Sequence, residues 1–304
     1  TSDEGEAGIC IGCIHDSDCG PGICFDYHCY QGAHAREIAT CQSRPYTLID
    51  GLHDVVEIVA DESSFAVRTR QGEVFRWGRV VAGQSGGRVL RSVRGVAQVP
   101  LPAPATQLAA NASTMCARLD DGRVSCWGLH NGQPTVEPAI IQGLPFVADL
   151  SRATRLSNHF CARIPSNVAA QSQFYCWGQN DWYQLGDGTN TSQSSPVDVD
   201  LGENNSAVMI GVGKTHTCAV LQDASISCWG YNIHGQIGDG TNTQRNVPTS
   251  VDLGQNRSAV AISLGESHTC ALLDDRSVKC WGHNNHGQLG DGTLTSSNTP
   301  ATVD

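Results

Sequence analysis

The sequence predicts an all-β protein: a β-propeller of about five four-stranded blades, preceded by a small disulfide-rich module. Three observations support this prediction. A Trp-Gly pair recurs along the chain, each copy repeats a set of short apolar stretches without helical periodicity, and fourteen cysteines fall into an N-terminal cluster and spaced pairs. The five Trp residues that precede Gly lie 50 to 52 residues apart, at Trp77, Trp127, Trp177, Trp229 and Trp281.

The repeated unit contains about four candidate strands. A copy opens with a Pro and a β-branched run, such as "PTSVDLG" from Pro248, and continues with an apolar stretch such as "SAVAISLG" from Ser258. A hairpin follows, "CALLDDRSVKCWG", and the long polar loop "HNNHGQLGDGTLTSSNT" ends the copy. Five copies at a period near 50 residues indicate a repeat architecture. Four-stranded units repeated around an axis are propeller blades.

The paired cysteines flank the hairpin turns. Cys218 and Cys228 are equidistant from Asp223 in the turn, so the two side chains are expected to face each other across the hairpin. Such pairs are close enough for a disulfide. Free thiols or a metal site are the alternatives, but pairs spread around a ring cannot converge on one metal ion. The first copy is expected to lack the bridge, with Phe65 and Arg76 at the two positions. The predicted disulfides join Cys116 to Cys126, Cys161 to Cys176, Cys218 to Cys228 and Cys270 to Cys280.

The N-terminal segment forms a separate predicted domain. We expect residues 1–44 to be an acidic leader and a Cys-rich disulfide module, and residues 45–304 to be the propeller. Six cysteines in so short a stretch are typical of a unit without a core of its own, and their connectivity stays open. The stretch "CIGCIH" does not match a haem attachment motif, because Ile14 separates the second Cys from the His. The six are Cys10, Cys13, Cys19, Cys24, Cys29 and Cys41.

Composition excludes several classes of protein. The 304 residues carry a formal net charge of −11, and the Lys and Arg residues are scattered, so we expect no nucleic-acid partner. No apolar run is long enough to span a membrane. Because the chain begins at Thr1, we expect a processed product. The even, paired cysteines predict a secreted or cell-surface location, extracellular or periplasmic.

The later copies resemble the regulator-of-chromosome-condensation repeat family of β-propellers. The residues that carry the resemblance are "GKTHTC" from Gly213, followed by "CWGYNIHGQIGDGT", and "GESHTC" from Gly265, followed by "CWGHNNHGQLGDGT". The resemblance covers residues 45 to 304 and is strongest in the last two copies. The hairpin cysteines look like those of a secreted bacterial branch. The family implies a rigid disc whose loops bind partners, and its fold does not fix the partner. One branch senses light with a "G-W-R-H-T" motif, whose Trp is missing here.

Several side chains are candidates for a site. Trp182 and Tyr183 place two large aromatic rings in a loop where other copies have small residues, and we expect them either to anchor a partner or to pack on a neighbouring blade. Asp-Gly in "GDGT" is expected to form turns rather than to bind calcium. His159, His216 and His268 stand at strand ends, where bonds to neighbouring backbone are favoured over metal binding.

These features favour an extracellular binding or adhesive scaffold for a protein or glycan. No catalytic motif is found, so we expect no enzyme, no cofactor and no metal. Two alternatives stay open: a structural subunit of a surface assembly or filament, and a lyase or hydrolase at the channel mouth.

Closure of the propeller is the last expectation. The runs "PYTLIDG" from Pro45 and "PATVD" from Pro300 both look like opening strands that compete for one position at a seam. A closed five-bladed ring is favoured because a ring buries its edges within one chain. A piece of a longer propeller and an open form that assembles through its edge are the alternatives.

Overall fold

The computed structural model divides the chain into two compact units, Thr1–Leu52 and His53–Asp304. It describes residues 23–25, 28–30, 52–84, 87–130, 133–153, 156–165, 174–202 and 205–303. In the first unit, β1 (Ile23–Phe25) and β2 (His28–Tyr30) form an antiparallel pair in which Cys24 lies opposite Cys29. The other four N-terminal cysteines lie outside the described residues, and the domain boundary at residue 44 stays a prediction.

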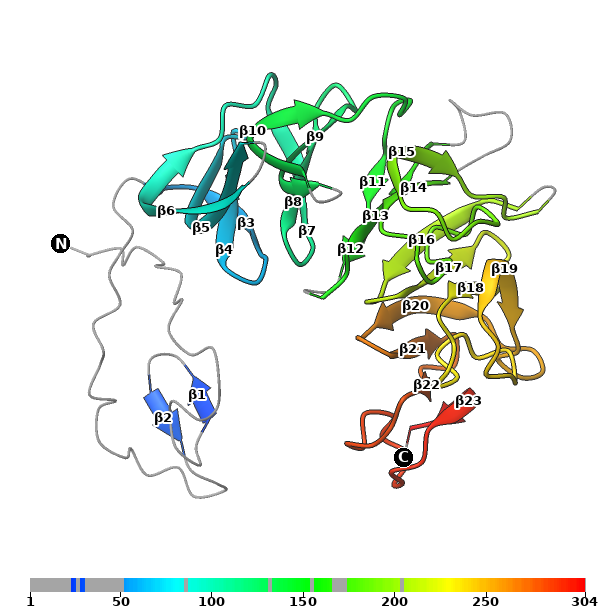
Figure 1. Ribbon diagram of the computed structural model, residues 1–304. Coiled ribbons are helices and arrows are strands. Elements are labelled where there is room, and N and C mark those ends of the chain that lie inside the picture. Colours follow the sequence, from blue (N-terminus) through cyan, green and yellow to red (C-terminus); the bar gives the residue numbers. More distant parts are fainter. Residues whose placement is uncertain are drawn as a thin grey trace. The chain divides into compact units, whose positions relative to one another are not determined.

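The second unit contains five antiparallel four-stranded sheets, here called blades 1 to 5 (Figure 1). This confirms the predicted all-β architecture. Blade 1 comprises β3 (Val55–Ala60), β4 (Ser64–Thr69), β5 (Val74–Gln84) and β6 (Gly87–Gln98). Blade 2 comprises β7 (Ala105–Ala110), β8 (Thr114–Leu119), β9 (Val124–His130) and β10 (Gln133–Ile140).

The remaining blades follow the same order. Blade 3 comprises β11 (Asp149–Leu150), β13 (His159–Arg163), β14 (Phe174–Gly178) and β15 (Gln193–Asp198), and β12 (Arg152–Ala153) pairs in parallel with blade 4. Blade 4 comprises β16 (Ala207–Val212), β17 (His216–Leu221), β18 (Ile226–Gly230) and β19 (Arg245–Val251). Blade 5 comprises β20 (Ala259–Leu264), β21 (His268–Leu273), β22 (Val278–Gly282) and β23 (Ser297–Thr302). No described helix is long and apolar enough to cross a membrane.

The Pro-containing runs end the blades rather than open them. The run from Pro248 belongs to β19, which pairs with β18 of the same blade. The run from Pro300 likewise belongs to β23, the fourth strand of blade 5. The expected order of strands within a copy was therefore wrong by one strand. Neither the β-branched residues nor the Pro indicates on which side of the hairpin such a strand pairs.

Each blade has two chemically different faces, because side chains alternate along its strands. In blade 4, Thr217, Ala219 and Trp229 point to one face, here called the Trp face. Cys218, Val220 and Ile226 point to the other, here called the disulfide face. One core cluster combines the disulfide of blade 3 with Trp229, and another combines the disulfide of blade 4 with Trp281. The disulfide face of one blade therefore packs on the Trp face of the next.

Four hairpin disulfides are present, one in each of blades 2 to 5. Each joins two cysteines that are register partners with a Cα–Cα distance of 4.1 Å, for example Cys218 and Cys228. In blade 1 the matching register partners are Ala66 and Arg76. Phe65 instead lies opposite Trp77 and stacks on it, with ring centroids 5.6 Å apart. The assignment of Phe65 to the first cysteine position was wrong: that position lies 11 residues before the Trp, as Cys218 does before Trp229, and this spacing leads to Ala66 in blade 1.

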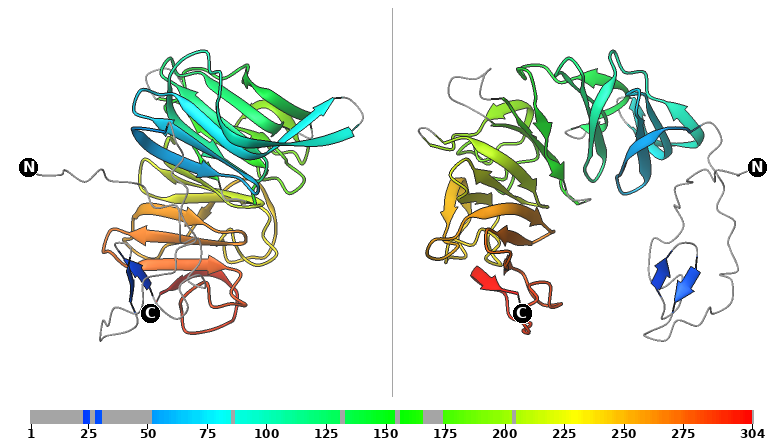
Figure 2. Two further views of the ribbon diagram at one scale, coloured as in Figure 1. Left: turned by 90° about the vertical axis from the view of Figure 1, so that its left-hand side faces the viewer. Right: turned by 180° about the vertical axis from the view of Figure 1, so that it is seen from behind.

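The five blades form an open arc rather than a closed ring. Blades 1 and 5 stand at opposite ends of the arc in Figure 1 and in both views of Figure 2. Within the described residues, no strand of blade 1 pairs with a strand of blade 5. The closed five-bladed ring was therefore the wrong expectation. The strand at residues 45–50, which was expected at the seam, lies outside the described residues.

An engineered bridge tests the register of blade 1. The double substitution Ala66→Cys, Arg76→Cys is expected to form a disulfide spontaneously and to raise the free energy of unfolding by about 2–3 kcal/mol, as expected for a short hairpin loop. The matched control, Phe65→Cys with Arg76→Cys, is expected to leave two free thiols because its side chains point to opposite faces. Thiol titration and chemical denaturation measure both effects. A bridge in the control alone would show that the register is different.

Candidate functional site

Three polar loops on the rim of blades 3 to 5 share one hydrogen-bond framework. Each follows the Trp-Gly pair and is organised by a buried Asn side chain: Asn180, Asn232 and Asn284. The Asn180 Oδ1 atom accepts a hydrogen bond from Leu185 N at 2.9 Å, and its Nδ2 donates to Thr189 O, also at 2.9 Å. Blades 4 and 5 repeat both kinds of bond. Buried polar bonds that are fully paired make the loops rigid.

The Asp residues of "GDGT" are part of this framework. Asp187 Oδ1 accepts hydrogen bonds from Asn180 Nδ2 at 3.1 Å and from Thr189 N at 2.9 Å. Asp239 additionally forms an ion pair with Arg245 at 2.5 Å. These carboxylates are used in forming turns. Among the described residues, no group of three or more His, Cys, Asp and Glu side chains is arranged to hold a metal ion.

Aromatic and imidazole rings form a continuous row across the rigid loops. Trp182 lies edge-on to Tyr231 with ring centroids 4.8 Å apart, and Tyr231 lies 6.5 Å from His234. His234 in turn lies 4.5 Å from His283. The row, here called the rim ladder, comprises these four side chains and crosses from blade 3 to blade 5. Each of its two close contacts joins the fifth residue after the Trp of one copy to the second residue after the Trp of the next copy, so the repeat itself produces the row.

The rim ladder combines exposure with partial desolvation. Trp182 is 41% exposed, and the other three rings are half-buried. Burial, and then the nearby His283, lower the pKa of His234. The Gln288 Nε2 and His283 Nδ1 atoms lie 3.2 Å apart, which fixes the orientation of the His283 ring. The rings therefore present a rigid surface, and stacking and hydrogen bonding can both act on it.

The two predicted aromatic residues have different roles. Trp182 belongs to the rim ladder and packs on Tyr231 of blade 4, which is one of its two expected roles. Its role as an anchor for a partner stays a prediction. Tyr183 stacks on no other aromatic ring of the described residues, and its φ is 65°. The equivalent residues Gly235 and Gly287 have φ values of 81° and 74°. Tyr183 therefore occupies a backbone conformation that favours glycine.

The predicted His residues lie between blades. The His159 Nε2 atom lies 2.8 Å from Thr217 Oγ1 of the next blade, and His216 Nε2 lies 2.9 Å from Thr269 Oγ1. The expectation of bonds to neighbouring backbone was wrong, because the His ring points across the interface. The small Gly213 next to His216 makes this possible, since a Cβ there would lie 2.3 Å from the imidazole ring.

A loop carbonyl completes each of these interfaces. Thr217 Oγ1 donates to Gln184 O at 2.8 Å, and Trp229 Nε1 donates to the same oxygen at 3.0 Å. Thr269 and Trp281 donate in the same way to Gln236 O. We call this set of a His, a Gln carbonyl, a Thr and a Trp the interblade joint. It connects the core of the propeller to the rim loops.

Burial lowers the pKa of both fully enclosed His residues. The pKa of His159 and that of His216 are each about 3, and desolvation is the main cause. The pKa of His268 is also lowered, mainly by desolvation, but this side chain is only half-buried. The two enclosed rings are therefore neutral at physiological pH, and the hydroxyl of Thr is a suitable partner for them.

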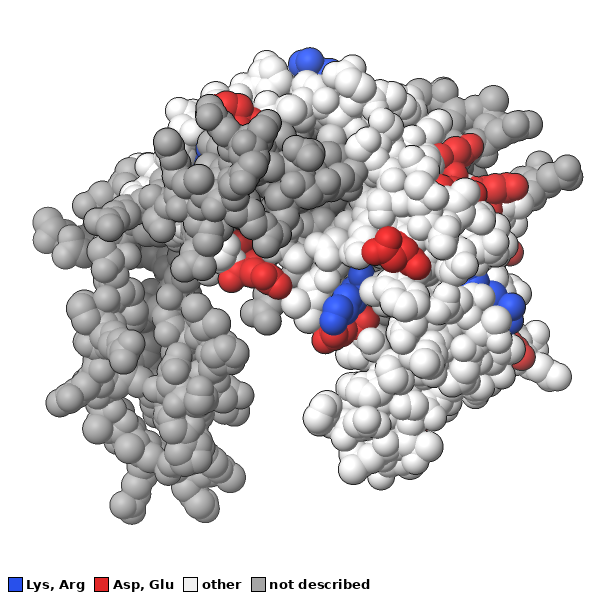
Figure 3. Space-filling model, in the orientation of Figure 1, with Lys and Arg blue, Asp and Glu red and all other residues white. Residues whose placement is uncertain are grey.

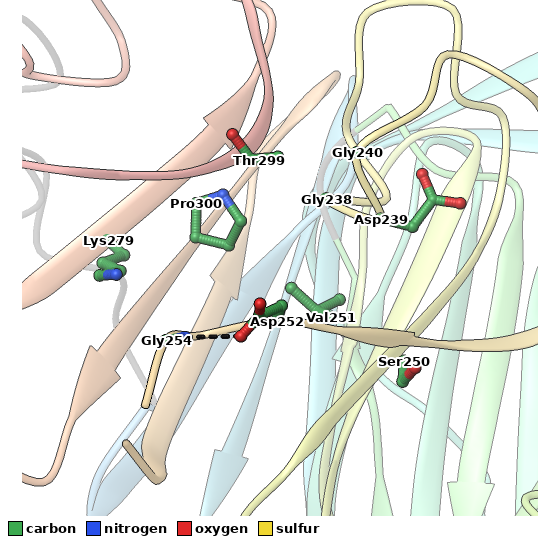
Figure 4. Close-up of a pocket in the computed structure, with 10 residues that line it drawn as sticks. All are labelled: Gly238, Asp239, Gly240, Ser250, Val251, Asp252, Gly254, Lys279, Thr299 and Pro300. Carbon is green, nitrogen blue, oxygen red and sulfur yellow. Dashed lines mark hydrogen bonds between the residues drawn. The ribbon is translucent and has the colours of Figure 1, made fainter. Parts of the chain in front are cut away.

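A polar groove lies on the outer side of blades 4 and 5. Its cavity has a volume of about 440 Å³, and Figure 4 shows Asp239, Asp252 and Lys279 among its lining residues. Each of these charged groups already has a partner. Asp239 forms an ion pair with Arg245, Asp252 accepts a hydrogen bond from Gly254 N at 2.8 Å, and Lys279 Nζ donates one to Leu253 O at 2.9 Å. The groove therefore offers no convergent set of unpaired groups.

Sequence reasoning found one of the four residues of the rim ladder. Tyr231, His234 and His283 were missed, because nothing within its own copy distinguishes any of the three. The signal lies in comparing neighbouring copies: position 182 of one copy and position 231 of the next are both aromatic, and positions 234 and 283 are both His.

Comparison with known proteins identifies the repeats. The family model described as regulator of chromosome condensation (RCC1) repeat matches residues 172–220 and 225–272, and a second model of that description matches residues 259–288. The ultraviolet-B receptor UVR8 of Arabidopsis thaliana is 26% identical over 266 residues, which are 84% of this chain and 60% of the receptor. The human E3 ubiquitin-protein ligase HERC2 is 25% identical over 245 residues, 77% of this chain but 5% of the ligase.

Solved structures show the same fold. Prp20p of Saccharomyces cerevisiae, which was studied together with its binding to Gsp1p and histones, superposes with a TM-score of 0.68 at 19% identity. The match covers 82% of this chain and 63% of Prp20p. The chain therefore spans less than two thirds of the length of each of these three proteins.

The enclosed His residues predict that acid destabilises the protein. The pKa of each ring in the folded state lies below the unfolded value of about 6.5. Their contribution to the free energy of unfolding is therefore fully present above pH 6.5 and is lost as the pH falls towards 3. At pH 5 each is expected to lower the free energy of unfolding by about 2 kcal/mol relative to neutral pH.

A substitution isolates this effect. His216→Asn is expected to lower stability at pH 7 but to make the slope of stability between pH 6 and pH 4 shallower, by about 1.4 kcal/mol per pH unit. The matched control is His286→Asn, which makes the same substitution at an exposed His on the same repeat type. Urea unfolding at a series of pH values measures the slope. An unaltered slope in His216→Asn would show that this ring is already protonated when folded.

Relief of backbone strain tests the role of Tyr183. Tyr183→Gly is expected to raise the free energy of unfolding by up to about 1 kcal/mol, because the left-handed conformation costs a glycine nothing. Trp182 should keep its contact with Tyr231. Thermal unfolding and Trp fluorescence report on the two effects. A loss of stability would mean that the Tyr183 ring makes packing contacts stronger than the strain.

Proposed function

We propose that this chain, whose later copies match the regulator of chromosome condensation repeat, is an extracellular binding scaffold whose rim ladder binds a protein partner. The observation that carries the proposal is the continuous row of rings from Trp182 to His283. A row that crosses three blades on rigid loops is suited to a macromolecular surface. It is wider than a small ligand needs.

The chemistry of the rim ladder favours a protein. Protein interfaces concentrate their binding energy in a few aromatic side chains such as Trp and Tyr. Trp182 is exposed yet held by Tyr231, so little conformational freedom is lost when a partner covers it. Prp20p, which shares the fold, binds the proteins Gsp1p and histones. The proposed binding of a protein is therefore consistent with the protein partners of a structure that has the same fold.

The distribution of surface charge favours a partner that is recognised mainly by contacts other than ion pairs. On the face drawn in Figure 3, charged side chains of the described residues are few, and both signs are interspersed. Among the described residues, several charged side chains are paired with a neighbour, as Lys214 is with Glu266 and Arg257 with Asp275. Binding at the rim ladder should therefore depend only weakly on salt concentration.

The disulfides support the extracellular part of the proposal. All four hairpin bridges link buried or half-buried cysteines and are compatible with an oxidising compartment. A scaffold held by covalent hairpins keeps its loops in place in such a compartment. Adhesion through glycans is a narrower alternative, since exposed Trp rings can also stack on sugars.

Substitutions in the rim ladder test the proposed function. Trp182→Ala and Tyr231→Ala are each expected to weaken partner binding by about 10-fold or more, in line with aromatic interface hot spots. The matched controls are Leu294→Ala and Val247→Ala, which remove exposed apolar side chains outside the rim ladder and should leave affinity unchanged.

The experiment has two steps. A photoreactive amino acid at position 182 of the secreted full chain first captures proteins from the surface of cells of the source organism. Binding of the captured protein to each variant is then measured by surface plasmon resonance at two salt concentrations. Equal affinity in Trp182→Ala, Tyr231→Ala and the two controls would rule out the rim ladder as the binding site.

A further inference from the structure

The outer hairpin of blade 1 continues beyond the blade itself. Its strands β5 and β6 have 11 and 12 residues, whereas β18 and β19 of blade 4 have 5 and 7. In blade 4 the pairing of these two strands ends at Gly230. In blade 1 the equivalent residue is Gly78, and six further residue pairs follow it. We call the strand residues past this point, 79–84 and 87–94, the basic arm.

The basic arm starts where the other blades have their rim loops. In blades 3 to 5 the residues after the Trp-Gly pair form the loops that carry the rim ladder, and in blade 1 the residues after Trp77 and Gly78 form the arm. The left view of Figure 2 shows this hairpin, in cyan, reaching past the blades. A two-stranded hairpin is only marginally stable by itself in water, so a second surface that covers it is favourable.

The charge of the basic arm is opposite to that of the whole chain. Residues 74–119 contain six Arg and neither Asp nor Glu, although the chain has a formal net charge of −11. The Lys and Arg residues are scattered when the whole sequence is considered, so this local concentration becomes apparent only once the hairpin is known. Four of the six Arg lie in the arm: Arg79, Arg88, Arg91 and Arg94.

The strand register supplies no acidic neighbour within the arm. The register partners of its first three Arg residues are all uncharged, namely Ser92, Gly83 and Val80. In the inner strands of the same blade, by contrast, Arg68 has Glu57 at 2.8 Å. All four cations of the arm are Arg and none is Lys. A guanidinium group can bond two oxygens of one phosphate at once, so this composition favours an oxyanion as the ligand.

Apolar residues are interleaved with the Arg residues of the arm. Because residues alternate between the two faces of a strand, Arg79, Val81 and Leu90 share one face of the hairpin. Val80 and Arg91, which are register partners, share the other face. Each face therefore combines basic with apolar residues, which a purely ionic ligand does not need.

The combination points to one class of anionic partner. Single-stranded nucleic acids are bound largely by stacking of their bases on aromatic side chains, and residues 78–98 contain no aromatic residue. The surface of an anionic bilayer offers phosphate oxygens to Arg and, directly below them, an apolar boundary to Val and Leu.

We propose that the basic arm binds the surface of a membrane that contains anionic phospholipids. Its Arg residues bind the lipid phosphates, and its Val and Leu residues enter the boundary between head groups and acyl chains. The arm lies on the bilayer and does not span it. This surface is separate from the rim ladder, and the proposal does not depend on it. Unlike binding at the rim ladder, binding of the arm should weaken strongly as the salt concentration rises.

Vesicle flotation of the full chain tests the proposal. The chain is expected to bind vesicles of phosphatidylcholine mixed with an equal amount of phosphatidylglycerol, and not vesicles of phosphatidylcholine alone. An Arg near an anionic surface is worth about fivefold in affinity, so removal of all four charges is expected to weaken binding by about 100-fold or more. The variant combines Arg79→Gln, Arg88→Gln, Arg91→Gln and Arg94→Gln.

The matched control removes the same number of charges from exposed Arg residues outside the arm. It should bind the anionic vesicles as the original chain does. Thermal unfolding and peptide mapping of the four hairpin disulfides show whether both variants have folded. An equal loss in the two variants would show that only the overall charge matters and would overturn the proposal, as would an original chain that ignores anionic vesicles. The control combines Arg70→Gln, Arg123→Gln, Arg257→Gln and Arg276→Gln.

The apolar residues of the arm distinguish a lipid from a soluble polyanion. The double substitution Val81→Ser, Leu90→Ser is expected to weaken vesicle binding by about 10-fold, because less apolar surface enters the bilayer. Binding of inorganic polyphosphate, measured by the same chain in solution, should not change. A double variant that keeps full vesicle binding, with polyphosphate or single-stranded DNA bound as tightly as vesicles, would identify a soluble polyanion as the partner and contradict the proposal.

Discussion

The contact between a buried Trp and the disulfide of the preceding blade is the interaction on which the rest of this structure depends. Trp177, Trp229 and Trp281 are fully buried, and each packs on a hairpin that a disulfide holds closed, in the preceding blade. Truncating such a side chain costs about 3–5 kcal/mol in a typical core. The bridge fixes the hairpin against which the indole packs, so covalent and hydrophobic stabilisation act at the same place.

The interblade joint connects the buried Trp side chains to the rim loops. The indole N–H of Trp229 and the Thr217 hydroxyl both donate to the carbonyl of Gln184, which belongs to the loop that carries Trp182. Packing at the core therefore sets the position of the loop, and the loop sets the position of the ring. This connection is why a surface made only of loops can be rigid enough to bind a partner with little loss of entropy.

The sequence allowed the fold to be predicted more fully than the site. The recurring Trp-Gly pair and the symmetric cysteines such as Cys218 and Cys228 predict the blades and their bridges, because both depend on local spacing within one hairpin. The rim ladder depends on contacts between copies, so Tyr231 and His283 could not be identified from their own copy. The open arc was missed for a similar reason, since the packing between blades is not visible in the spacing within one copy.

The burial of the hairpin disulfides has a consequence for how the chain matures. Cys218 and Cys228 are both completely enclosed once blade 5 packs on them, so an oxidoreductase cannot reach them in the native protein. Oxidation must therefore come before the blades stack, and a wrongly paired hairpin would prevent the next blade from docking. Each blade can therefore dock only after the disulfide of the preceding hairpin has formed correctly. Cys270 is half-buried, which leaves the last bridge the most open to thiol exchange.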